Sequence, residues 1–194
     1  MLLIGSRLIG AQVMSLQTGS ALAQTVEAII DPAVLAVVAY RLEGAMLERG
    51  TYYVRIDDVR ELSDIGMIID SADELVASGD VIKLDDIIEL GFKLVGMLVM
   101  DETGKKLGKV IDYNLDTTSF KVEQLTVRRP FFSSLKDVEL LVHRSQIIEI
   151  NDRGIVIHSR AKAPEHTRVS TPGAYVNPFR KQSSAPQNGH AADY

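Results

Sequence analysis

Polar and apolar residues alternate along two stretches of the chain, and this pattern predicts β-strands. Residues 25–30 and 120–127 largely alternate between the two kinds of side chain. A period of two gives a strand one face toward a core and one face toward water. Thr-Gly pairs at residues 18–19 and 103–104 lie between apolar runs and are typical of tight turns. The pattern therefore predicts short antiparallel strands joined by hairpin turns.

The same pattern occurs twice in the chain. Thr18-Gly19, Leu22-Ala23 and Ile30-Asp31 recur 85 residues later as Thr103-Gly104, Leu107-Gly108 and Leu115-Asp116. Near the end of each copy, Val59, Leu62, Asp64, Gly66, Ile68 and Ile69 recur 88 residues later as Ile147, Ile150, Asp152, Gly154, Val156 and Ile157. The change in spacing indicates three inserted residues in the middle of the second copy. Matching order at both ends indicates an internal repeat.

The repeat predicts a mainly β protein with two tandem small antiparallel β-barrels, at residues 1–70 and 92–158. Barrel closure removes exposed sheet edges, which suits short strands at regular spacing. Residues 71–91 are expected to form a connector with one or two short helices, because capping and acidic residues open two segments there. Residues 159–194 are expected to be a disordered basic tail, since four of the six prolines fall there.

The composition is that of an ordinary soluble globular protein, with 46% hydrophobic and 24% charged residues. The chain has no Cys, which excludes disulfides, thiolate zinc sites and a Cys nucleophile. We expect a cytoplasmic protein without a transmembrane segment. Ala21-Leu22-Ala23 resembles a signal-cleavage site, but Arg7, Gln12 and Gln17 interrupt the apolar run that such a signal needs.

The net charge of −5 is unevenly distributed. Residues 159–194 carry five Lys or Arg against two acids, so residues 1–158 carry −8. Proteins that bind the phosphate backbone draw much of their affinity from Lys and Arg. An acidic body therefore argues against general nucleic-acid binding, and no specific DNA binding is expected.

Four segments of the second copy resemble a PRC-barrel: residues 94–99, 103–110, 147–150 and 154–157. The resemblance covers nearly all of residues 1–158 in two copies, and the second copy is the clearer one. The first copy departs from the pattern at three positions, where Ala23, Gln24 and Thr25 replace Gly108, Lys109 and Val110.

The resemblance implies a fold and a general role. PRC-barrels include the cytoplasmic part of the photosynthetic reaction-centre H subunit and a domain of a ribosome-maturation factor that docks on a small-subunit ribosomal protein. The family's glycines and apolar alternation describe a barrel and carry no chemistry. The resemblance therefore implies a non-enzymatic protein-binding adaptor. The alternative is an accessory factor of ribosome assembly or RNA processing, with a ribosomal protein or RNA as partner.

The sequence offers no catalytic residue, metal site or cofactor site. A phosphate loop is superficially similar to the segment from Gly104 to Lys109. Such a loop needs Ser or Thr and then a helix after its lysine, whereas Val110 and an apparent strand follow here. The acid pairs 57–58 and 85–86 each precede an apolar run, where they are expected to cap a helix or lie in its first turn. The histidines have no metal-ligand spacing, and His143 is interpreted as a strand-end residue.

One surface segment has the residue types of a binding site. It lies in the longer middle of the second copy, and its proline is expected to end a strand and begin a loop. Arg and aromatic side chains are enriched at binding hot spots. The alternative is that an aromatic ring covers the barrel end or packs on the first barrel. The predicted partner-binding residues are Arg128, Arg129, Phe131 and Phe132.

We predict that the tail is dispensable for folding. Truncation after Ser159 should change the free energy of unfolding by less than about 1 kcal/mol, because the tail carries little apolar surface to bury. Limited proteolysis followed by thermal melting of the trimmed protein measures this. A protease-resistant tail, or a trimmed protein that melts far lower, would contradict the prediction.

Overall fold

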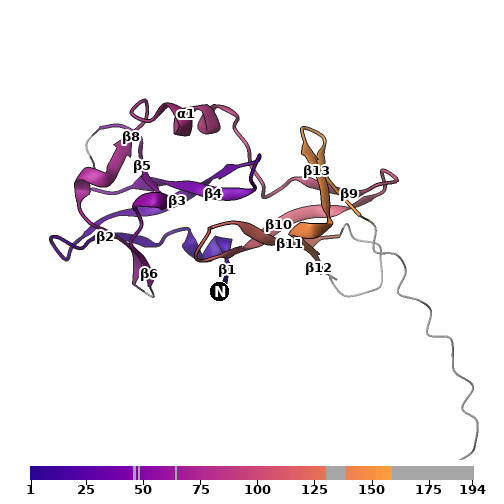
Figure 1. Cartoon of the computed structure of the whole chain (residues 1–194), viewed down its shortest axis with the longest axis horizontal. Coiled ribbons are helices and arrows are strands. Elements are labelled where there is room, and N and C mark those ends of the chain that lie inside the picture. The colour runs from indigo at the N-terminus through magenta and orange to yellow at the C-terminus, as the bar shows by residue number, and fades with distance from the viewer. Residues whose placement is uncertain (46, 48, 64, 130–138, 159–194) are drawn as a thin grey trace, which may run out of the picture. The chain divides into compact units, whose positions relative to one another are not determined.

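The computed structural model describes residues 1–45, 47, 49–63, 65–129 and 139–158, which form a mainly β fold of two seven-stranded sheets (Figure 1). The first sheet contains β2 (Gln12–Ser15), β3 (Ala21–Asp31), β4 (Ala36–Glu43), β5 (Tyr52–Arg55), β6 (Glu61–Ser63), β7 (Gly66–Ile69) and β8 (Leu75–Ala77). The second sheet contains β1 (Leu2–Ile4), β9 (Leu98–Asp101), β10 (Lys106–Asp116), β11 (Val122–Arg128), β12 (Glu139–His143), β13 (Ile147–Asn151) and β14 (Gly154–Ile157). The mainly β prediction is confirmed, and the predicted disordered tail lies outside the described residues.

The two sheets share one strand order. The first sheet runs β6-β7-β2-β3-β4-β5-β8, and the second runs β13-β14-β9-β10-β11-β12. In each sheet one neighbouring pair is parallel, β2 with β7 and β9 with β14, while the other pairs are antiparallel. Strands β2 to β7 thus correspond in order and direction to β9 to β14.

Closed barrels were expected, and this prediction is wrong for the described residues. Their strand pairing leaves β6 and β8 at the ends of the first sheet and β12 and β13 at the ends of the second. These edge strands have three to five residues each and offer few backbone groups for pairing across the remaining gap. Buried side chains of both sheets instead form one continuous apolar cluster. Each sheet therefore buries part of its apolar face against the other sheet, without closing into a barrel.

The segment between the copies contains one α-helix, α1 (Ile82–Glu89), as well as strand β8 of the first sheet. A 3-10 turn at Ala72–Glu74 begins where the Ser71 hydroxyl accepts a hydrogen bond from the Asp73 backbone at 3.2 Å, as a capping residue does. Leu84 of α1 packs with Ala39 and Tyr53, so the helix covers one face of the first sheet (Figure 1). The predicted domain boundaries stay a prediction.

The first strand of the chain belongs to the second sheet. β1 pairs antiparallel with β10, with Leu3 opposite Leu115. The backbone of Thr117 donates to the Met1 carbonyl at 2.9 Å, and a 3-10 turn at Gly5–Leu8 follows the strand. Residues 2–4 had been expected in the first barrel. The chain therefore crosses between the two sheets before it builds the first.

Two reciprocal hydrogen bonds join the sheets at equivalent positions. The Val37 backbone donates to the Phe120 carbonyl and the Val122 backbone donates to the Leu35 carbonyl, each at 3.0 Å. Leu35 and Phe120 are equivalent residues 85 positions apart, and so are Val37 and Val122. Between these positions, Ala36 forms an antiparallel β-bridge with its own equivalent, Lys121. The contact is thus related by a local two-fold axis.

The backbone at this contact is unusual in both copies. Leu35 has φ 47° and Phe120 has φ 52°, a left-handed conformation that side chains other than glycine rarely adopt. Both side chains are buried, at 4% exposure. Arg144 strengthens one side, because its guanidinium donates to the carbonyls of Leu35 at 3.0 Å, Val34 at 2.6 Å and Val122 at 3.2 Å. The contact therefore combines backbone pairing, apolar burial and a charged donor.

Tyr40 lies in the core and is 0% exposed. Its hydroxyl has no hydrogen-bond partner among the described residues, and burial raises the pKa of this phenol. The equivalent position of the second sheet is Leu125, which is also fully buried. An unpaired buried hydroxyl is costly because it loses its bonds to water and gains none.

We predict that Tyr40→Phe stabilises the protein by about 1 kcal/mol, because the ring stays in the core and the unpaired hydroxyl is removed. Urea unfolding measures the change, with Tyr52→Phe at a half-buried position of β5 as the control. A loss of stability greater than that of the control would show that the Tyr40 hydroxyl has a partner.

We also predict an acid-sensitive contribution from Asp116. Its carboxylate accepts from the backbone of Ser119 at 3.0 Å and from the amino-terminal ammonium at 3.1 Å, and these contacts lower its pKa from 3.8 to about 2. A lowered pKa stabilises the fold above pH 3.8, and this stability disappears as the pH falls toward 2. Asp116→Asn should therefore lose stability near neutral pH and show a shallower decline over that acid range. Equal slopes for both proteins in acid unfolding curves would contradict this.

Candidate functional site

A basic hollow lies on the face of the second sheet. Its volume is about 570 Å³, and it is lined by Leu98, Lys106, Gly108, Lys109, Ile111, Arg128 and Arg129. Lys109 on β10 lies directly opposite Arg128 on β11, and Leu98 on β9 lies on the other side of Lys109. Three adjacent strands thus place an apolar floor beside a row of cationic side chains.

Gly108 shapes this hollow. Its φ is 156°, and a Cβ atom at this position would lie 2.2 Å from the Arg128 carbonyl oxygen. The pairing of β10 with β9 is irregular between Lys106 and Gly108. The glycine therefore allows β10 to pass close to β11 at the point where the two lysines and two arginines converge.

The cations of the hollow are exposed and uncompensated. Within residues 1–129 and 139–158, as far as the structure describes them, Lys106, Lys109, Arg128 and Arg129 form no ion pair. Glu139 lies opposite Arg128 in the register of β12 without forming such a pair. Like charges directly opposite in a sheet repel each other. Binding of an anionic ligand in the hollow would therefore relieve the repulsion between these cations.

The equivalent positions of the first sheet carry different charges. The positions 85 residues earlier are Ala21, Gln24, Glu43 and Gly44. They carry no cation and one acid. The charge of the hollow is thus specific to the second copy, although the strand order is common to both.

Arg128 and Arg129 of the predicted binding segment lie at the rim of the hollow, whereas Phe131 and Phe132 lie outside the described residues. The sequence analysis missed Lys106 and Lys109. It interpreted Gly104 to Lys109 as a hairpin with solvated lysines, and the structure does place Gly104 in the turn before β10. The pairing of β10 with β11 is what brings the lysines beside the arginines. Bulges shift the register of this pair, so the residues that lie opposite each other are difficult to predict from sequence.

The residues considered for chemistry have structural contacts. The Asp58 carboxylate makes two 2.7 Å bonds with Arg55, and Asp85 accepts from the Gly79 backbone at 3.1 Å in the first turn of α1. His143 ends β12, where its Nδ1 lies 2.8 Å from the Ser145 hydroxyl and begins a capped turn. No cluster of three or more potential metal ligands occurs among the described residues.

No helix among the described residues has the length and apolarity needed to cross a bilayer. No curated protein matches the chain. One family model does match, and its span runs from the end of α1 through strands β9 to β14, so it includes the three strands that line the basic hollow. The match supports a general role in protein interaction or assembly. Residues 87–163 thus match the model of the PRC-barrel domain family.

Proposed function

We propose that the chain is a non-enzymatic adaptor built from two tandem PRC-barrel units, and that its partner is a protein bound in the basic hollow. The family match covers the second unit. Two observations support a first unit at residues 1–70: the shared strand order, and the 85-residue spacing of the contacts between the sheets. The proposal retains the cytoplasmic location expected from the sequence.

The basic hollow carries this proposal. It combines the apolar surface of Leu98 and Ile111 with four cations that form no ion pair with any described residue. Arginine is over-represented at binding hot spots because its planar group binds carboxylates with two hydrogen bonds. A protein segment with acidic residues on either side of an apolar side chain fits this surface.

The difference between the sheets implies one partner per chain. The first sheet presents Glu43 where the second presents Arg128. An acidic segment would be repelled there and attracted to the second sheet. The duplicated fold therefore offers one recognition surface and one supporting unit.

RNA is the second candidate partner, because four cations in one hollow can also neutralise backbone phosphates. The net charge of −8 on residues 1–158 and the apolar floor favour a protein. Each neutralised phosphate adds to the salt dependence of RNA affinity. Binding to small-subunit precursor RNA over a range of salt concentrations therefore separates the candidates.

We predict that Arg128→Glu combined with Arg129→Glu lowers partner affinity at least roughly tenfold, because both charge-assisted contacts are replaced by repulsion. Affinity capture with the whole chain, followed by titration of the captured protein, measures this effect. The matched control is Lys83→Glu with Arg153→Glu, two exposed cations outside the hollow.

The two double variants carry the same change of charge, so a general electrostatic effect would weaken both. Loss of the partner from the hollow variant alone supports the proposed site. Equal retention by both variants would contradict it, and release of RNA in place of protein would favour the second candidate.

A further inference from the structure

A second cavity lies between the two sheets, on the local two-fold axis. Its volume is about 300 Å³, and strands β3 and β10 supply opposite walls. Its lining contains three pairs of residues that are 85 positions apart: Ile9 with Leu94, Glu27 with Asp112 and Ala28 with Tyr113. Binding sites for small molecules are often found where two such units meet.

This cavity, called the cleft below, is open because equivalent positions in the two sheets carry side chains of different size. Tyr113 is 5% exposed, and its ring packs so closely on Gly5 that a Cβ atom there would lie 2.3 Å from Cε2 of the ring. Ala28 occupies the equivalent position of the first sheet. A methyl group in place of a phenol ring leaves space on that side of the axis.

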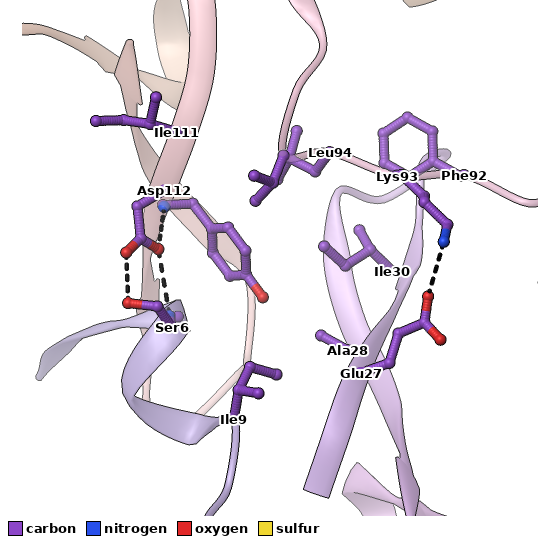
Figure 2. A pocket seen from close by; sticks show the side chains of 13 residues that line it. Ser6, Ile9, Glu27, Ala28, Ile30, Phe92, Lys93, Leu94, Ile111 and Asp112 are labelled. Carbon is purple, nitrogen blue, oxygen red and sulfur yellow. Dashed lines mark hydrogen bonds and ion pairs between the residues drawn. The ribbon is translucent and has the colours of Figure 1, made fainter. Parts of the chain in front are cut away.

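The walls of the cleft are apolar and its rim is polar. Ile30 and Leu94 are buried in the walls, at 5% and 1% exposure. Figure 2 shows Ser6 with Asp112 on one side and Glu27 with Lys93 on the other. Ser6 donates to Asp112 through its hydroxyl and its backbone, and Lys93 lies 3.3 Å from Glu27.

The rim charges are thus already paired. Glu27 also accepts a hydrogen bond from Arg41 of β4 at 3.2 Å. A charged ligand would have to displace one of these contacts. The cleft is therefore suited to a neutral molecule.

One polar group of the lining is unpaired. The Tyr113 hydroxyl forms no hydrogen bond with any residue that the structure describes. Burial raises the pKa of this phenol to about 12, so the hydroxyl keeps its proton and is a donor at neutral pH. The hydroxyl is not fully enclosed by protein atoms, so it is accessible from the cavity and can donate to a ligand there.

We propose that this cleft binds a small neutral ring compound whose oxygen or nitrogen acceptor takes the hydrogen bond of the Tyr113 hydroxyl. The volume of about 300 Å³ lies at the lower end of ligand pockets, which suits one or two fused rings. Ile30, Leu94 and Ile111 contact the ring, and Tyr113 selects molecules that carry an acceptor.

The test uses the neutral naphthyl ketone Prodan as the probe, because its emission shifts to the blue in apolar surroundings and its carbonyl is an acceptor. The full-length protein should bind one molecule per chain with a saturable blue shift. Ala28→Leu should abolish the shift because it fills the cleft. Ala77→Leu, at a half-buried position of β8, is the matched control and should bind as the parent protein does.

A conservative variant tests the hydrogen bond. Tyr113→Phe keeps the ring on Gly5 and should weaken Prodan about five- to tenfold, the effect of one hydrogen bond. Naphthalene, which has no acceptor, should bind both proteins equally. Thermal melting of each variant shows that it is folded. No saturable binding by the parent protein, or unchanged binding by Ala28→Leu, would overturn the site, and equal Prodan affinity for Tyr113→Phe would overturn the role of the hydroxyl.

Discussion

The reciprocal hydrogen bonds between residues 35–37 and 120–122 are the contact on which the arrangement of both sheets depends. The Val37 backbone donates to the Phe120 carbonyl and its equivalent, Val122, donates to the Leu35 carbonyl, each at 3.0 Å. Because Leu35 and Phe120 share a left-handed backbone, both turns present their carbonyl in the same way. A contact of this kind is self-complementary, as in a symmetric dimer, but here the chain supplies both halves.

Local symmetry makes the differences between the copies informative. Where the first copy has Ala28 and the second has Tyr113, a cleft opens on the axis. Where the first has Glu43 and the second Arg128, one face becomes a basic hollow. Arg144 likewise reaches across to Leu35, while the corresponding residue of the first copy, Ile56, is apolar. The two sheets share a strand order, and individual side chains distinguish their surfaces.

Local patterns were sufficient to predict the strands, the Thr-Gly turns and the helical segment before the second copy. Residues 25–30 lie in β3, and Gly104 lies in a turn, as their neighbours in sequence indicate. Closure was wrongly predicted because it depends on contacts between distant edge strands. Lys106 and Lys109 were missed because irregular pairing on both sides of β10 changes which residues lie opposite. Arg128 and Arg129 were chosen from residue type alone; the structure places them at the hollow, and their role in binding stays a prediction.

The exchange of β1 into the second sheet has a consequence for the order of folding. Met1 and Asp116 are 115 positions apart, so the first strand emerges from the ribosome long before the strand with which it pairs. The strands of the first sheet lie between them and can pair in the meantime. Contacts between distant parts of a chain form late because a long loop must be closed first. The amino-terminal strand can therefore take its place in the second sheet only after β10 has been synthesised.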